Sequence, residues 1–235
     1  MSDEDEPGHH PGGPPVDGKL DKYPFLAHYE KGYTEVADLE VEYQGFLHVR
    51  CPWTSHNCPK CNINYCHTDS LIVAVDGACR FNSTLAAQGS ACGVYLSPTD
   101  ETLNTSWSIS EPNGTPHTSQ RAELVAAAQG IKTGMEYVRN GGQVSCKCPD
   151  CRVKHLVIKS DSAYVVNGIT EYVKKWKVNG WRNAKGDTVA NLNPWKSLVE
   201  CVDQVTELGA IVSFWHVKRH DNEQADRLAN RGLDN

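Results

Sequence analysis

The sequence lacks the long apolar runs that mark a membrane protein. No stretch approaches the roughly 18–20 consecutive apolar residues that a membrane-spanning helix needs, so we expect no contact with a membrane. The first six residues, MSDEDE, have neither the apolar stretch of a secretory signal nor the Arg-rich, acid-poor character of a mitochondrial transit peptide. We therefore expect a cytoplasmic or nuclear protein.

The chain also lacks an excess of basic residues, because its formal net charge is −6. Such a charge argues at first against a polyanionic ligand. The acids are concentrated near the N-terminus, however: residues 1–70 hold 5 Lys/Arg against 12 Asp/Glu, whereas residues 71–235 hold 18 against 17. The larger C-terminal part is therefore close to neutral, and its composition is compatible with nucleic-acid binding.

Composition divides the 235 residues into three parts. Residues 1–18 are acidic and rich in Gly and Pro, which predicts a disordered tail. Residues 19–70 form an N-terminal extension that has no clear period and ends in a cluster of cysteines. From residue 71 to residue 235 the pattern is that of one α/β domain.

Short apolar runs alternate with amphipathic stretches in this domain. The apolar runs predict strands at residues 71–75, 91–96, 102–110, 155–159 and 210–215. Helical spacing and start signals predict helices at residues 118–138, 162–168 and 171–177, one that begins at Asn193-Pro194, and one capped by Asp221 or Asn222. This order predicts an α/β fold: a mixed five-stranded sheet with helices on both faces.

Four acidic residues stand where such a fold places functional groups. Asp76 and Asp161 each follow an apolar run, which predicts that each ends a strand, and Glu123 and Asp226 lie in the first turns of predicted helices. If the two strands are neighbours, the four carboxylates converge and repel one another. Protonation or hard divalent cations would relieve that repulsion, and oxygen ligands suit Mg²⁺ or Mn²⁺. Each acid taken alone could instead be an ordinary solvated residue.

Four segments together resemble the motifs of type 1 ribonuclease H, in the order found in that family. They are VDGAC at residues 75–79, TSQRAE at 118–123, SDS at 160–162 and NEQADRLA at 222–229, and NGW at 179–181 and Asn191 match as well. The resemblance covers residues 71–235. It implies an RNase H-like fold and an endonuclease that hydrolyses the RNA strand of RNA–DNA hybrids and leaves 5′-phosphate and 3′-hydroxyl ends.

The resemblance also implies roles for the carboxylates in a site with two Mg²⁺ or Mn²⁺ ions. Asp76 would bridge both metals, and Glu123 and Asp161 would complete the site near the leaving group. Asp226 would help to hold the metal that activates the attacking water. We expect the enzyme to be a monomer.

Other residues match positions at which the family contacts its substrate. Cys79, Asn82, Ser119 and Gln120 would read the minor groove, where the 2′-hydroxyl distinguishes RNA from DNA. Thr118 and Asn191 would bind a DNA phosphate. Tyr164, Tyr172 and Trp176 would line the channel for the DNA strand, with Tyr172 standing where the family often has Trp. The stretch from Lys174 to Lys185 adds basic residues and no acid.

One position departs from the family pattern. His220 matches a histidine that lies on a mobile loop in the family and aids proton transfer and product release. Here five residues separate His220 from Asp226, so the loop is shorter. His220 either keeps this catalytic role or is a surface residue.

The ten cysteines, with no secretory signal, favour a metal or free thiols over disulfides. Seven of them form two clusters. The first, which spans residues 51–66, lies near His56 and His67 and contains a Cys-Pro-Lys-Cys knuckle. The second, at residues 146–151, precedes the strand that leads to Asp161. We interpret them as ligands of a structural Zn²⁺, held by the first cluster or shared by both. Reduced thiols and disulfides are the alternatives. The candidate ligands are Cys51, Cys58, Cys61, Cys66, Cys146, Cys148 and Cys151.

Three other functions are alternatives to the ribonuclease. A hybrid-binding adaptor without catalysis would need a broken carboxylate set, and all four acids are present. An integrase-like strand-transfer enzyme would share the fold and the metal chemistry, but the basic, Trp-bearing segment and the TSQRAE motif favour the ribonuclease. A zinc-centred interaction module is compatible with residues 1–70, which supply no positive signature for it.

Overall fold

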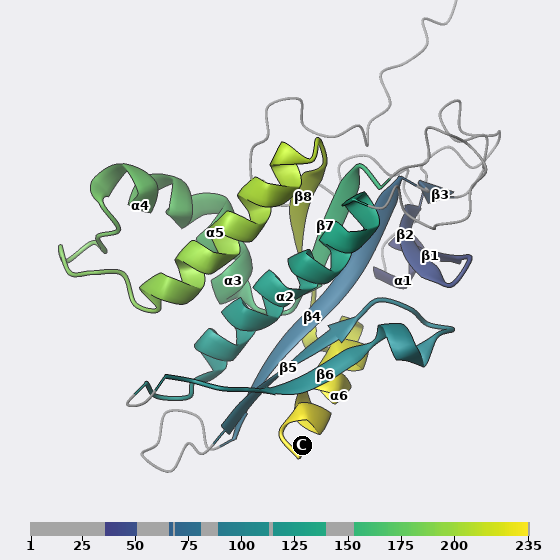
Figure 1. Ribbon diagram of the computed structural model, residues 1–235, viewed down its shortest axis with the longest axis horizontal. Helices are drawn as coiled ribbons and strands as arrows, with labels where there is room; N and C mark the ends of the chain where they lie inside the picture. Colours follow the sequence, from purple (N-terminus) through teal and green to yellow (C-terminus); the bar gives the residue numbers. More distant parts are fainter. Residues whose placement is uncertain are drawn as a thin grey trace, which may run out of the picture.

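The computed structural model describes residues 36–50, 66–67, 69–80, 89–112, 115–139 and 153–234. Its centre is a five-stranded sheet with the strand order β6-β5-β4-β7-β8 (Figure 1). The strands are β4 (Ser70–Arg80), β5 (Gly89–Tyr95), β6 (Thr105–Ile109), β7 (His155–Ser160) and β8 (Ile211–His216). The β4-β7 and β7-β8 pairs are parallel, and the β4-β5 and β5-β6 pairs are antiparallel. The expected mixed five-stranded sheet is confirmed.

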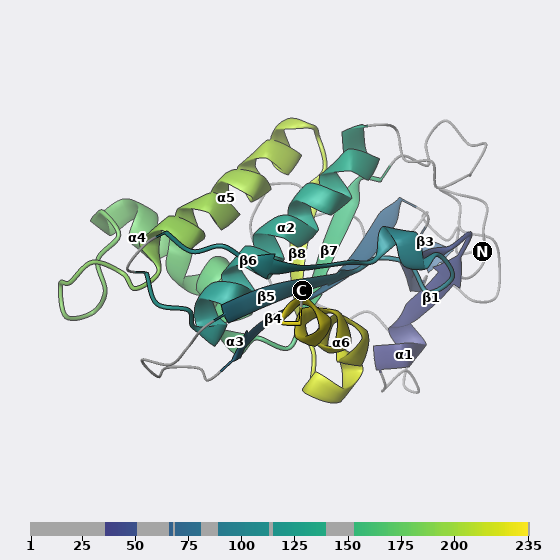
Figure 2. The same ribbon diagram turned by 60° about the horizontal axis from the view of Figure 1, so that its bottom comes forward.

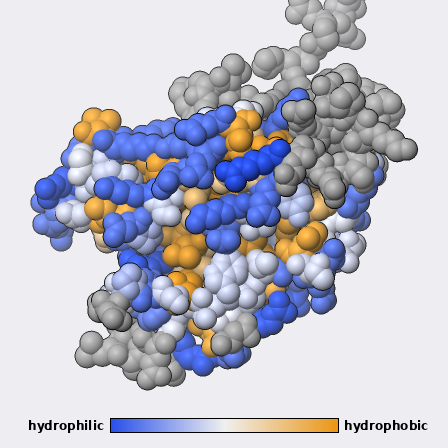
Figure 3. All heavy atoms as spheres, in the orientation of Figure 1, coloured by the Kyte–Doolittle hydropathy of each residue, from blue (hydrophilic) through white to orange (hydrophobic). Residues whose placement is uncertain are grey.

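Helices cover both faces of this sheet, as expected. The long helices α2 (Ser119–Arg139) and α5 (Leu192–Glu207) lie on one face, and α6 (Glu223–Gly232) lies on the other (Figures 1 and 2). Apolar side chains of α2 and α5 pack in one core with those of the strands, while hydrophilic residues predominate on the outer surface shown in Figure 3. None of the helices in the described ranges is both long and apolar enough to cross a membrane.

A small N-terminal unit covers the part of the second face that α6 leaves open. It consists of α1 (Val36–Leu39), β1 (Glu40–Tyr43), β2 (Phe46–Arg50) and β3 (Cys66–His67), whose strands form a separate sheet. Three of its apolar side chains pack against four from the main sheet and its margin: Leu39, Leu47 and Val49 against Ile72, Val157, Trp215 and Val217. The extension is therefore packed into the fold over residues 36–50, although its sequence showed no clear period.

A buried ion pair adds to this contact. Lys159 Nζ of β7 lies 2.6 Å from Glu40 Oε1 of β1, and the two side chains are only 7% and 15% exposed. The pair therefore joins the N-terminal unit to the strand that leads into Asp161.

One predicted strand end was wrong. β4 does not stop at Asp76 but continues to Arg80, because its second half pairs with β5 as far as Arg80↔Gly89. The parallel pairing of β4 with β7, by contrast, ends at Ala74↔Lys159. Asp76 therefore lies inside β4, two residues beyond Ala74, the last β4 residue that pairs with β7.

Two further boundaries also differ from the prediction. The strand expected at 102–110 begins only at Thr105, because Asp100 caps a short 3₁₀ turn, η2 (Glu101–Leu103), by accepting the N–H of Thr102. The helices expected at 162–168 and 171–177 form one continuous path: α3 (Ala163–Asn167), the π-helical stretch η3 (Gly168–Tyr172) and α4 (Val173–Asn179). The predicted break falls in the π-helical stretch.

Candidate active site

Two acidic residues meet where the parallel pairing ends. Asp161 directly follows the last residue of β7, and Asp76 lies just past the last β4 residue that pairs with β7. Since the two strands are parallel neighbours, their carboxyl-end residues share one edge of the sheet, as the sequence had predicted.

Two glycines bring helices against the sheet at this edge. A Cβ at Gly77 would collide with the backbone of Ala122 and Glu123, so the absence of a side chain lets the start of α2 approach β4. A Cβ at Gly93 would likewise collide with the backbone of α6. Gly93 lies opposite Asp76 in the β4-β5 ladder. The two glycines thus place Glu123 and Asp226 beside the strand that carries Asp76.

Three of the four carboxylates converge. Asp76, Glu123 and Asp161 each offer one oxygen, and these three oxygens lie within 4.8 Å of one another. Together with Asp226 they line a cavity of about 280 Å³. Asp76 is only 6% exposed. A cluster of anions this compact in a partly buried place is unfavourable without a cation or protons.

Burial and the repulsion between the acids raise the pKa values of two of them. Burial, followed by the charges of Asp161 and Asp226, raises the pKa of Asp76 to about 7. Burial, followed by the charges of Asp76 and Asp161, raises the pKa of Glu123 to about 9. In addition, the Oε2 atom of Glu123 is buried and has no hydrogen-bond partner. An oxygen-only set with an unsatisfied buried oxygen fits a hard divalent cation.

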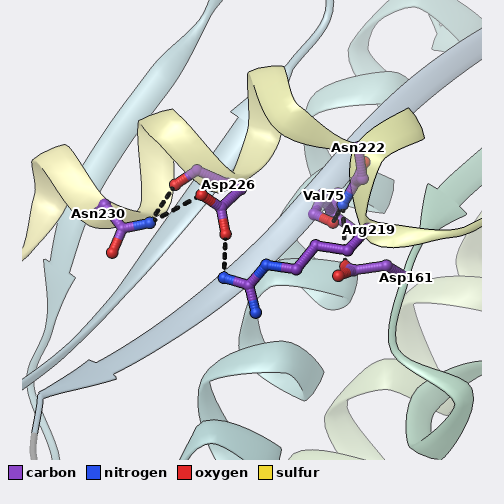
Figure 4. A network of polar contacts seen from close by, with 6 residues as sticks. All are labelled: Val75, Asp161, Arg219, Asn222, Asp226 and Asn230. Atoms are coloured by element: carbon purple, nitrogen blue, oxygen red, sulfur yellow. Dashed lines mark hydrogen bonds and ion pairs between the residues drawn. The ribbon is translucent and has the colours of Figure 1, made fainter.

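Asp226 lines the same cavity but is engaged differently. Its Oδ1 accepts a hydrogen bond from Arg219 Nη2 at 2.5 Å, and its Oδ2 accepts one from Asn230 Nδ2 at 3.0 Å (Figure 4). It does not belong to the group of three whose oxygens lie within 4.8 Å. The structure therefore brings all four predicted acids to one cavity, three of them in a tight group.

Asn222 fixes the position of Asp161. Its side-chain amide donates to Asp161 Oδ1 at 3.1 Å and to the carbonyl of Val75 at 3.0 Å (Figure 4). Asn222 occupies the N-cap position of α6, as predicted, but its side chain makes no capping hydrogen bond and is almost fully buried. This residue therefore ties the start of α6 to Val75 of β4 and to Asp161, which directly follows β7.

The family model of RNase H matches residues 68–234 of this chain. The chain belongs to the RNase H family. Ribonuclease H of Dichelobacter nodosus is 30% identical over 167 residues, which are 70% of this chain and 92% of that protein. The segments that resembled type 1 ribonuclease H thus fall within a match that covers the predicted α/β domain from residue 71 to residue 234.

Longer relatives within the RNase H family also match. Ribonuclease H1 of Mus musculus is 34% identical over 168 residues, and that of Homo sapiens is 32% identical over 168 residues; each match covers 70% of this chain. The chain spans about half the length of these two curated relatives. Among solved structures, RNase H1 of Halobacterium salinarum aligns with a TM-score of 0.42 at 19% identity, covering 70% of this chain and 98% of that one.

The predicted minor-groove residues gather at the start of α2. Ser119 and Cys79 line the carboxylate cavity. Gln120, which follows Ser119 in the sequence, is exposed. Thr118 precedes the helix and accepts the N–H of Arg121 through its hydroxyl. Arg121 in turn forms an ion pair with Glu111. Asn82 lies outside the described residues.

The predicted DNA-channel residues form a second cluster, built on α3, η3 and α4. Tyr164 accepts hydrogen bonds at its hydroxyl from Asn191 Nδ2 at 3.2 Å and from the fully buried Trp195 at 3.1 Å. The rings of Tyr172 and Trp176 follow with centroids 5.9 Å apart. The structure therefore brings these predicted residues, which are up to 27 positions apart, onto one surface.

The predictions for His220 and the cysteines have different outcomes. His220 is exposed, lies in the short segment η4 (Arg219–Asp221), pairs with Asp221 at 3.4 Å, and is not among the residues that line the cavity. The proposed zinc ligands fall outside the described residues, except that Cys66 is described as part of β3 without its side chain. The zinc site stays a prediction. Cys79, Cys92 and Cys201 are free thiols.

Sequence reasoning did not single out Arg219 or Asn230 as site residues. Asn230 is four residues after Asp226 in α6, and this helical spacing places the two side chains on one face. Arg219 had no such signal, because its contact with Asp226 depends on how the segment between β8 and α6 turns.

Proposed function

We propose that this chain is an endonuclease that hydrolyses the RNA strand of RNA–DNA hybrids with two Mg²⁺ or Mn²⁺ ions, leaving 5′-phosphate and 3′-hydroxyl ends. The observation that supports this most directly is the convergence of Asp76, Glu123 and Asp161, whose oxygens lie within 4.8 Å of one another. Membership of the RNase H family and relatives named Ribonuclease H support it independently.

The residues of the site fit divalent ions. All four acids offer oxygen ligands, and Glu123 has a buried oxygen that no other group in the described part of the chain satisfies. Burial, followed by repulsion from the neighbouring acids, raises the pKa of Asp76 and of Glu123, and a bound cation would offset both effects. When bound, a pair of such ions lowers the pKa of the attacking water and stabilises the departing 3′ oxygen.

Each acid then has a distinct part. Asp76 would be shared by both ions, and Glu123 and Asp161 would hold the ion near the leaving group. Asp226, on the α6 side of the cavity, would help to hold the ion that binds the attacking water. Asn222 would act as a positioning residue, because its amide holds one oxygen of Asp161 and so directs the other.

Selection of the RNA strand would come from the residues at the rim. Ser119 and Cys79 line the cavity, and Gln120 stands next to Ser119 at the start of α2. Their polar side chains and the nearby backbone would contact the minor groove and the 2′-hydroxyl, with Asn82 as a further contact.

The DNA strand would bind along the second cluster. Tyr164, Tyr172 and Trp176 supply ring surfaces, and Asn191 and Thr118 would bind a phosphate. Lys174 and Lys175, on the exposed side of α4, would attract the backbone electrostatically.

A gel assay with labelled substrates tests the proposal. RNA–DNA, RNA–RNA, DNA–DNA and single-stranded RNA would be incubated with Mg²⁺, Mn²⁺ or chelator. We expect cleavage of RNA in the hybrid, dependent on the metal. Metal-dependent cleavage of the DNA strand instead would favour a strand-transfer type of enzyme, and hybrid binding without cleavage would favour an adaptor.

A further inference from the structure

Both oxygens of Asp226 already have partners within the protein. Oδ1 accepts from the Arg219 guanidinium and Oδ2 from the Asn230 amide (Figure 4). This sets Asp226 apart from Asp76, Glu123 and Asp161, which each offer one oxygen to a group whose members lie within 4.8 Å of one another. Each oxygen keeps a second lone pair, but a cation that binds Oδ1 must do so beside the Arg219 guanidinium, whose positive charge repels it.

The partner of Oδ1 is itself a cation. Among the described residues that line the carboxylate cavity, Arg219 is the one with a positively charged side chain. Its charge acts on the other acids as well, since it lowers the pKa of both Asp76 and Glu123 against the larger raising effects. The guanidinium therefore supplies, at this cavity, part of the positive charge that a second metal ion would bring.

The Arg219 side chain can move away from Asp226 into solvent. It is 77% exposed and lies in the short segment η4, and its hydrogen bond to Asp226 is the one side-chain hydrogen bond that the described structure gives it. The Asn230 amide, in contrast, also bonds to the Asp226 carbonyl within α6 at 2.8 Å. If Arg219 moves away, Asp226 stays anchored through Asn230, and Oδ1 is relieved of the positive charge that repels a second cation.

We propose that Arg219 competes with the second divalent ion for Asp226, so that the two ions bind in order. The first ion would occupy the site of Asp76, Glu123 and Asp161, whose carboxylates accept no hydrogen bond from a basic side chain in the described part of the chain. The second would bind only as Arg219 releases Asp226. This inference rests on the proposed two-metal function.

Direct binding of Mn²⁺ to the full chain without substrate tests the inference, because it does not depend on activity. Free Mn²⁺ would be followed by electron paramagnetic resonance during titration of the wild type and of Arg219→Gln. We expect the variant to bind the second ion about two- to fivefold more tightly, the worth of an exposed ion pair, with a smaller change at the first site. An unchanged or weaker second site would overturn the proposal.

Two controls separate direct competition from a general field effect. Lys218→Gln removes a neighbouring exposed positive charge that is not among the described ion-pair or hydrogen-bond partners of the Asp226 carboxylate, and it should alter the second site less than Arg219→Gln does. An equal change in both variants would contradict the proposal. In an Asp226→Asn background, Arg219→Gln should no longer change Mn²⁺ binding at the second site. A change that persists would also contradict the proposal. A wild type that binds no Mn²⁺ would instead overturn the two-metal function itself.

Discussion

Gly93 of β5 lies directly opposite Asp76 of β4, on the face against which α6 packs. The lack of a side chain at Gly93 is what allows the backbone of α6 to lie against the strand, and through it Asp226 reaches the cavity. A single glycine thus sets the spacing between two of the proposed metal ligands.

Substitution of Gly93 by Ala should therefore displace α6. The added methyl would collide with the backbone at Ala225 and Ala229, and we expect a loss of about 1–3 kcal/mol in the free energy of unfolding, typical of overpacking, together with a large fall in hybrid cleavage. Gly89→Ala is the matched control, because a Cβ there meets nothing within 4 Å. Denaturant unfolding and cleavage rates measure both. Equal behaviour of the two variants would show that α6 is not held this closely.

The metal-free protein should lose stability as the pH rises. An acid with a pKa raised by folding binds its proton more tightly in the folded state, so its stabilising contribution is present at low pH and lost through the window between the unfolded and folded pKa values. For Asp76 this window runs from 3.8 to about 7, and for Glu123 from 4.5 to about 9. In chelator, the melting temperature should fall from pH 5 to pH 9 more steeply than in a Glu123→Gln variant. Mg²⁺ should flatten the wild-type profile, and parallel profiles for wild type and variant would contradict this account.

The N-terminal unit should be needed for stability of the domain built on the five-stranded sheet. Leu39 is 2% exposed and packs in the same cluster as Val157 and Trp215 of the main sheet, so Leu39→Ala should cost about 2–5 kcal/mol of unfolding free energy. Leu208→Ala, at a position that is 44% exposed, serves as the control and should cost far less. A Leu39→Ala variant as stable as the wild type would indicate that residues 36–50 are an appendage.

Asn222 should affect turnover through Asp161. Removal of its amide in Asn222→Ala frees the Asp161 carboxylate, and loss of a residue that orients a metal ligand typically costs about 10–100-fold in activity or metal affinity. The loss should appear in kcat and in the Mg²⁺ requirement, with KM for the hybrid nearly unchanged. Gln224→Ala, an exposed change in the same helix, is the control. A rise in KM alone would mean that Asn222 serves substrate binding instead.

The sequence predicted the parts of the fold that depend on local pattern. The apolar runs before Asp76 and Asp161, and the helix that carries Glu123, were placed correctly, and the assumption that the two strands are neighbours proved right. The end of β4 was misplaced because Asp-Gly resembles a turn, whereas pairing with β5 continues the strand past it.

What the sequence could not predict depends on tertiary contact. The packing of Leu39, Leu47 and Val49 has no periodic signature, because these residues come from a short helix and a short strand that are buried by a distant sheet. The contact of Arg219 with Asp226 spans seven positions and follows from the path of η4. Asp221 or Asn222 was expected to cap α6; Asn222 occupies the N-cap position, but its side chain bonds to the carbonyl of Val75 and the carboxylate of Asp161 instead.

The most direct test of the proposed function compares cleavage and binding in one variant. Asp161→Asn preserves shape but removes one negative charge from the converging group, so it should abolish Mg²⁺-dependent cleavage of the RNA strand while the affinity for a labelled RNA–DNA hybrid stays within about threefold of the wild type, because phosphate contacts elsewhere supply most of the binding. Cleavage by Asp161→Asn at the wild-type rate would contradict the assignment of this cavity as the catalytic centre.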